Sequence, residues 1–127
     1  MAARVQEQGV LEQTCNEVVL VGRVSREPEQ KELPSGDVLV LFSVIVDRPP
    51  SRRPVPEGSR AVSTDTIDCV AWAAGVRRTA GGFAPGDVVR VEGALQRRFW
   101  RGVRGPTSKC EIEVAALKRL VRAQASR

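Results

Sequence analysis

The sequence contains no histidine and no tyrosine. Histidine is the commonest general base and the commonest transition-metal ligand, so its absence excludes Ser-His and Cys-His nucleophile pairs and most metal-assisted chemistry. The glycine-rich stretch 81–86 lacks the Lys-Ser/Thr of a phosphate loop. Asp65 and Asp68 lie in an expected strand, where their side chains face different directions. We therefore expect no enzyme, no metal site and no cofactor.

Cysteine and long apolar runs are also scarce. Cys15, Cys69 and Cys110 lie too far apart for a C-x-x-C metal knuckle and are too few for a disulfide framework. Cys69 and Cys110 occur in strand-like patterns, so we expect them to be buried, unreactive thiols. The longest apolar stretch, 38–46, is about half of the roughly 18 residues that a spanning helix needs, and no signal peptide is evident. These features predict a cytoplasmic protein without a membrane contact.

The length of 127 residues predicts one domain with a core of its own. Twenty Lys and Arg against 15 Asp and Glu give a net charge of +5, which favours a polyanionic partner or an anionic surface. The excess is local: residues 48–60 have four arginines and one acid, residues 97–109 have five cations and no acid, and residues 1–32 have four cations and six acids. Charge gathered in two segments favours phosphate contact over a merely solvated surface.

Five segments show the alternation or the β-branched composition of strands, and we predict strands at 16–24, 38–46, 63–72, 87–98 and 110–120. The first two are separated by a Glu-Pro bend and a Pro-Ser-Gly turn, and residues 73–80 predict a short helix closed by two glycines. Residues 101–109 are expected to form a loop before the last strand. This order predicts an all-β fold, the five-stranded Greek-key OB barrel with one short helix between strands 3 and 4.

The pattern also predicts the organisation of the chain. Residues 1–15 are expected to be a flexible leader or a short extra strand, residues 16–120 the barrel domain, and residues 121–127 a polar basic tail. Residues 48–60 contain four prolines and four arginines, which can form neither a helix nor a packed core. We expect a long basic loop there.

Aromatic residues are few, and they are Phe42, Trp72, Phe83, Phe99 and Trp100. Strand alternation places Val89, Val91 and Leu95 on the core face. The same alternation places Trp100 on the outer face with Gln96 and Arg98, and it points Phe99 toward the core. An exposed indole beside a guanidinium suits base stacking, whereas core packing or a subunit contact is the alternative for both tryptophans.

Four stretches, taken in order, resemble the bacterial single-stranded DNA-binding protein family. They are 16–36 (NEVVLVGRVSREPEQKELPSG), the strand 38–46, 68–72 (DCVAW) and 85–100 (PGDVVRVEGALQRRFW), and the resemblance spans about residues 16–120. It implies an OB barrel, a homotetramer, and single-stranded DNA bound without base specificity during DNA replication, recombination and repair. It also implies a cytoplasmic, nucleoid-associated protein.

The resemblance and the charge pattern together predict the binding residues. Trp72 corresponds to a stacking aromatic of the family, and Trp100 is the second expected platform, each stack contributing on the order of 1–3 kcal/mol. The arginines expected to contact phosphates are Arg23, Arg48, Arg52, Arg53, Arg60, Arg97, Arg98, Arg101 and Arg104.

The sequence departs from the family in two ways. Aromatic rings common at Asp47–Pro50 and at Thr66 are absent, so we expect weaker and more salt-sensitive binding. Family members usually continue into a disordered tail with an acidic tip that recruits other DNA-processing enzymes, whereas no acid follows Glu113. Either a truncated chain or a short, tail-less paralogue accounts for this difference. The sequence gives no support for recruitment through such a tip.

The main alternative is an OB-fold protein-interaction module, such as a primosomal accessory protein, whose outer face meets another protein. Recognition of double-stranded DNA is not expected, because the only predicted helix is about two turns long. Quenching of tryptophan fluorescence by oligo-dT separates the two hypotheses.

Overall fold

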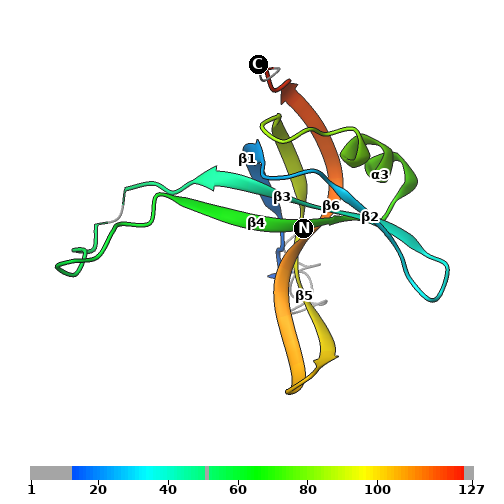
Figure 1. The fold of residues 1–127 in the computed structure, drawn as a ribbon, viewed down its shortest axis with the longest axis horizontal. Helices are drawn as coiled ribbons and strands as arrows, with labels where there is room; N and C mark the ends of the chain where they lie inside the picture. Colours follow the sequence, from blue (N-terminus) through cyan, green and yellow to red (C-terminus); the bar gives the residue numbers. More distant parts are fainter. Residues whose placement is uncertain (1–12, 51, 125–127) are drawn as a thin grey trace.

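The structure is a computed structural model that describes residues 13–50 and 52–124. The predicted leader therefore lies mostly outside the described residues, as do residues 125–127 of the predicted tail. The elements are β1 (Val18–Val24), β2 (Glu29–Glu32), β3 (Val38–Asp47), β4 (Thr64–Ala71), α3 (Ala74–Gly81), β5 (Val88–Gly102) and β6 (Gly105–Val121). Figure 1 shows these elements around a central barrel, from which the β5–β6 hairpin and the β3–β4 loop project in different directions.

Five of the strands close into a barrel. The sheet order is β1-β5-β6-β4-β3-β2, and an additional pairing between β1 and β3 closes the ring. The short strand β2 lies outside this ring and, among the described strands, pairs with β3 alone, so the two form a hairpin. The pairing between β4 and β6 is parallel, whereas the other pairings are antiparallel. The predicted five-stranded OB barrel, with one short helix between its third and fourth strands, is confirmed.

Two glycines permit the close approach of strands. A Cβ at Gly22 would lie 2.3 Å from the carbonyl oxygen of Ile45, where β1 meets β3. A Cβ at Gly93 would lie 2.1 Å from the carbonyl oxygen of Glu113, beside a register shift in the β5–β6 ladder. Any larger side chain would push these strands apart, so both positions serve the curvature of the barrel.

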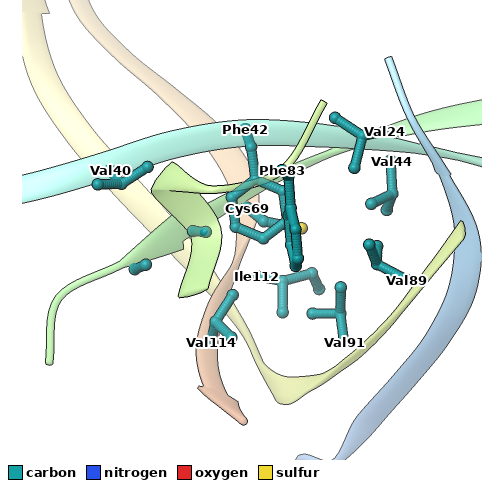
Figure 2. Packing of buried hydrophobic residues seen from close by; sticks show 12 residues of the cluster. Val24, Val40, Phe42, Val44, Cys69, Phe83, Val89, Val91, Ile112 and Val114 are labelled. Atoms are coloured by element: carbon teal, nitrogen blue, oxygen red, sulfur yellow. The ribbon is translucent and has the colours of Figure 1, made fainter. Parts of the chain in front are cut away.

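The core is built from the inward side chains of these strands. Val44, Val89 and Val91 are fully buried, and Phe42 and Phe83 meet edge to face with ring centroids 5.8 Å apart. Figure 2 shows Phe83 in the middle of this cluster beside Phe42 and Cys69, with Val24, Val44 and Val89 to one side and Val91, Ile112 and Val114 below. Helix α3 packs beside β3, β4 and β6 and contributes Ala80 to the same cluster.

One buried carboxylate joins the turn before β5 to the end of β6. Asp87 is fully buried and accepts hydrogen bonds from the backbone N–H of Ala123 (2.7 Å) and of Ala84 (2.8 Å), and from Nε of Arg119 (2.9 Å). These donors, the backbone groups first, lower the pKa of Asp87. The chain just after β6 is thereby fixed to the barrel.

The β5–β6 connection differs from the prediction. The predicted loop at 101–109 is wrong: β5 continues to Gly102, β6 begins at Gly105, and the turn consists of Val103 and Arg104. Gly105 has a φ of +115°, which a side chain would disfavour, and it permits this tight turn. The last strand therefore begins five residues earlier than the predicted start at Cys110.

The longer hairpin also corrects three predictions of burial. Leu95 and Phe99, expected to face the core, are 47% and 72% exposed, and Cys110 is exposed as well. Alternation assigned the side of the strand, but the hairpin projects past the barrel, where no core covers that side (Figure 1). Cys69 is buried as expected, and its burial, followed by the charges of Asp68 and Glu111, raises its pKa to about 12.

The remaining boundaries agree closely with the expectations. The helix is shifted by one residue from the predicted 73–80, and β3 ends one residue beyond the predicted strand. In the described part of residues 48–63 the chain forms no strand or helix. Over the described ranges, no helix is long and apolar enough to cross a membrane.

Candidate nucleic-acid interface

The outer surface of β3, β4 and β6 carries a network of polar groups. Ser43 and Asp68 are register partners, and the Ser43 hydroxyl donates to Asp68 at 2.8 Å. Lys109 of β6 donates from Nζ to the second oxygen of Asp68 at 2.9 Å. The pKa of Asp68 is lowered, chiefly by Lys109 and further by Ser43, so this carboxylate remains ionised.

These groups line a hollow of about 240 Å³. The rest of its wall comes from the charged residues Arg26, Glu27, Glu29 and Glu111 and from the less polar Leu41, Phe42 and Cys69. Two cations and four carboxylates surround it, so the hollow suits a polar, hydrogen-bonding ligand better than an apolar one. Among the described residues, no group of three or more Cys, Asp or Glu could hold a metal ion.

The β5–β6 hairpin has two faces, defined by its cross-strand pairs. One face, termed here the indole face, contains the pairs Gln96–Glu111, Arg98–Lys109 and Trp100–Thr107. The opposite face contains the pairs Arg97–Cys110, Phe99–Ser108 and Arg101–Pro106. The predicted grouping of Trp100 with Arg98 and Gln96 is therefore confirmed, whereas Arg97 and Arg101 lie on the other face, with Phe99.

Trp100 lies partly open on the indole face. The indole is 39% exposed, and the guanidinium carbon of Arg98 lies 4.8 Å from the ring centroid. Arg98 in turn donates from Nε to Oε1 of Glu111 at 3.2 Å. This arrangement is a cation–π contact anchored by an ion pair.

Trp72 occupies a different part of the surface. It follows the last residue of β4, is 38% exposed, and its carbonyl accepts a hydrogen bond from Arg77 at 2.5 Å. Continuing the alternation of β4 puts Trp72 on the side of Asp68, the side that lines the hollow. The two tryptophans are therefore far apart in the chain: Trp72 lies between β4 and α3, and Trp100 lies two residues before the end of β5.

All nine predicted arginines are exposed. Several nevertheless have partners within the protein. Arg48 forms a two-pronged ion pair with Asp65, with contacts of 2.5 Å and 3.0 Å. Arg23 lies 4.0 Å from Asp47, and Arg97 donates to the Ser108 hydroxyl at 2.9 Å.

The other predicted arginines lie at the two projecting segments. Arg52, Arg53 and Arg60 lie in the β3–β4 loop, where Arg53 and Arg60 help to line an open groove with Pro54 and Val55. Arg104 lies at the tip of the hairpin, one residue after Val103. The structure thus brings Arg98 to an aromatic ring and leaves Arg23 on the barrel strand β1, whereas the other predicted arginines lie along the β5–β6 hairpin and the β3–β4 loop.

Sequence reasoning missed four residues that contribute to this surface. Phe99 is the most exposed of the aromatic residues named above, and the basic run around it was the available signal. Lys109 was counted in that run without a role. Asp68 and Glu111 gave no signal. The pairing of β4 with β6 brings Asp68 beside Lys109, and the register of the β5–β6 hairpin brings Glu111 beside Arg98.

Comparisons with known proteins agree on one family. The model of the "Single-strand binding protein family" matches residues 15–120. A single-stranded DNA-binding protein of Oceanobacillus iheyensis is 36% identical over 92 residues, which are 72% of this chain and 54% of that protein. Single-stranded DNA-binding protein A of Bacillus subtilis is 32% identical over 90 residues, 71% of this chain and 49% of that protein. The chain spans about half the length of these curated relatives.

A solved structure adds a comparison of folds. The Plasmodium falciparum SSB in complex with ssDNA superposes with a TM-score of 0.67 at 26% sequence identity. The match covers 84% of this chain and 96% of that one.

Proposed function

This chain belongs to the single-strand binding protein family, and on that premise we propose that it binds single-stranded DNA on the outer face of its barrel and along the β5–β6 hairpin. Binding is independent of base sequence, because stacking on aromatic rings and contact with phosphates are both tolerant of sequence. The protein would thereby coat single strands during DNA replication, recombination and repair, in the cytoplasm at the nucleoid.

The observation that supports this proposal best is the half-exposed indole of Trp100 on an arm that has no core. An indole left 39% open beside a guanidinium has little structural purpose on a hairpin projecting from the barrel. Exposed rings beside cations form the usual platform for unpaired bases. Trp72, at the end of β4, provides the second platform of the proposal, and the exposed Phe99 provides a ring on the opposite hairpin face.

Phosphate contacts would come from the arginines of the β5–β6 hairpin and of the β3–β4 loop. Arg48 and Arg98 are each paired with a carboxylate in the free protein, so a phosphate has to compete for them. Arg101 and Arg104 lie beyond the barrel at the end of the hairpin. Each phosphate neutralised releases counterions, so affinity should fall steeply with salt.

We also propose that the protein assembles as a homotetramer, as the family resemblance implies. Residues 18–23 of β1 pair with β5 on one edge of the strand. On the other edge, only Arg23 and Val24 pair with β3 among the described residues. Val19 and Val21 on this strand are 54% and 51% exposed. An edge of this kind, with apolar side chains, supports pairing with a second copy.

The test of binding is a fluorescence titration with oligo-dT across a salt series, combined with measurement of the mass of the complex. We expect strong quenching that salt reverses. Trp100→Ala and Trp72→Ala should each lower affinity by roughly 5- to 150-fold, the equivalent of about 1–3 kcal/mol for a lost stack. Unchanged emission at low salt would contradict the proposal and favour the protein-interaction module.

A matched pair of arginine variants tests the location of the phosphate contacts. Arg101→Ala removes a cation from the hairpin, whereas Arg78→Ala removes an exposed cation from the last turn of α3. Only Arg101→Ala should reduce the slope of log affinity against log salt, by about 0.7 for one phosphate on a single strand. Equal slopes for both variants would mean that the hairpin is not the contact surface.

A further inference from the structure

Glu111 is a nearly buried carboxylate at the base of the β5–β6 hairpin, with its side chain 7% exposed. Burial of a carboxylate is unfavourable unless hydrogen bonds and an opposite charge compensate it. The neighbouring cation, Lys109, donates instead to Asp68 of β4 at 2.9 Å. The compensating contact for Glu111 is therefore the one from Nε of Arg98 at 3.2 Å.

The register explains why this contact forms. Glu111 lies opposite Gln96, and Arg98 lies opposite Lys109, so Glu111 and Arg98 are diagonal neighbours on the indole face. Diagonal positions on one face are within reach of a long side chain. Since Nε of Arg98 is held by Glu111, the planar guanidinium lies across the ring of Trp100, 4.8 Å from its centroid.

We propose that Glu111 is a positioning residue for single-strand binding: it holds Arg98 over one face of Trp100, so that the indole offers its opposite face to a base. This inference rests on the proposed function but concerns the free protein first. Glu111 also pairs with the charge of Arg98, so in the free protein this arginine supports the aromatic ring and a phosphate has to compete with Glu111 for it.

The first test needs no DNA. In a Trp72→Phe background, Trp100 is the sole emitter, because the sequence has two tryptophans. Acrylamide reaches an indole through its open faces, so Glu111→Ala and Arg98→Ala should each raise the quenching constant, by up to about twofold if one face is uncovered. The quenching constant of the double variant should be no larger than that of either single variant, because both substitutions uncover the same face of the indole.

Glu111→Gln is the conservative rescue. The glutamine side chain keeps an oxygen that can accept from Nε of Arg98 but lacks the charge. We expect its quenching constant to stay closer to the parent than that of Glu111→Ala. Circular dichroism and thermal melting verify that each variant is folded, and Gln in place of Glu keeps the test available if the alanine variant unfolds.

The second test measures DNA binding by the same variants. Glu111→Ala releases Arg98 from its carboxylate, so the dependence of log affinity on log salt should steepen by about 0.7. The steepening should vanish when Arg98 is also alanine. A merely structural role of Glu111 would lower affinity equally at all salt concentrations and in both arginine backgrounds.

The outcomes separate the two proposals. If the parent protein does not bind oligo-dT but the quenching constants change as expected, single-strand binding fails and the positioning of Arg98 stands. If Glu111→Ala leaves the acrylamide constant unchanged while Arg98→Ala raises it, Arg98 holds its place without Glu111 and the inference is wrong.

Discussion

The two halves of β5 follow one alternation and reach opposite outcomes. Val89 and Val91, in the first half, are fully buried, whereas Phe99 continues the same side of the strand and is 72% exposed. The first half closes a barrel, and the second half extends past it with β6 as its only partner in the described structure. Burial is therefore decided by what packs over a strand and not by the alternation within it.

The difference also separates stability from the proposed binding. The barrel is held by apolar burial and by Asp87, and the hairpin by its ladder and polar contacts such as that between Arg97 and Ser108. Substitutions in the barrel should therefore lower the unfolding free energy. Substitutions in the β5–β6 hairpin and the β3–β4 loop should change DNA affinity with little effect on the unfolding free energy.

The largest expected effect is a loss of unfolding free energy in the barrel, and it is tested by comparing two phenylalanines. Phe42→Ala removes a ring that is 4% exposed and packs edge to face on Phe83, and we expect a loss of about 3–5 kcal/mol of unfolding free energy. Phe99→Ala, on the hairpin, should change it by less than about 0.5 kcal/mol. Urea denaturation measures both. Similar losses for the two variants would break the division between barrel and hairpin.

Asp87 tests the polar part of the barrel. Asp87→Asn removes a buried charge that pairs with Arg119, and we expect a loss of about 3 kcal/mol at neutral pH. The pKa of Asp87 is lower in the folded protein, so its contribution is fully present above the unfolded value of about 4 and is lost as the pH falls through the folded value. Denaturation at several pH values should therefore show that the difference in unfolding free energy between the parent and Asp87→Asn becomes smaller in acid. A difference that persists there would mean that the charge of Asp87 is not the cause.

Gly22 tests the closure of the barrel at a smaller scale. Gly22→Ala places a Cβ against the carbonyl of Ile45, so β1 and β3 must separate, and we expect a loss of about 1–3 kcal/mol. Gly75→Ala, in α3, meets nothing within 4 Å and should stabilise the protein by up to about 1 kcal/mol. Thermal melting distinguishes the opposite signs. Equal shifts would show that β1 and β3 tolerate separation.

The smallest expected effect on folding comes from the base of the β3–β4 arm. Asp65→Asn weakens the ion pair that engages Arg48, a contact that lowers the pKa of Asp65. We expect tighter binding of oligo-dT, a salt dependence steeper by about 0.7, and unchanged melting. Asp37→Asn, at the β2–β3 turn, is the control for loss of a negative charge alone. If both variants bind alike, Arg48 makes no phosphate contact.

The sequence predicted the barrel well, because its signals are local. Alternating valines, the turn at Pro34–Gly36 and two glycines after a short helix specify strand, hairpin and helix within a few residues. The same signals failed at 101–109, where glycine and proline predicted a loop. There the cross-strand ladder continues over both residue types, and Pro106 pairs with Arg101 at the edge of the projecting hairpin.

For the candidate site, the sequence indicated the kinds of residue but not their partners. It grouped Trp100 with Arg98 correctly, because both lie on one side of one strand. It also named Arg97 as a phosphate contact, and that side chain lies on the other face, where it donates to Ser108. It gave no sign that Asp65 engages Arg48, since the two residues are separated by the whole β3–β4 loop.

By itself, the sequence determined an OB barrel, its excess of positive charge in two segments and its few aromatic rings, because composition and period-two alternation are properties of single strands. Only the tertiary structure decided which of these features are buried, which arginines are already paired, and that Glu111 reaches Arg98 beside Trp100. The physical reason is that burial depends on which strands pack over one another when the barrel closes, and ion pairing depends on the register between neighbouring strands, and neither is a property of a single strand.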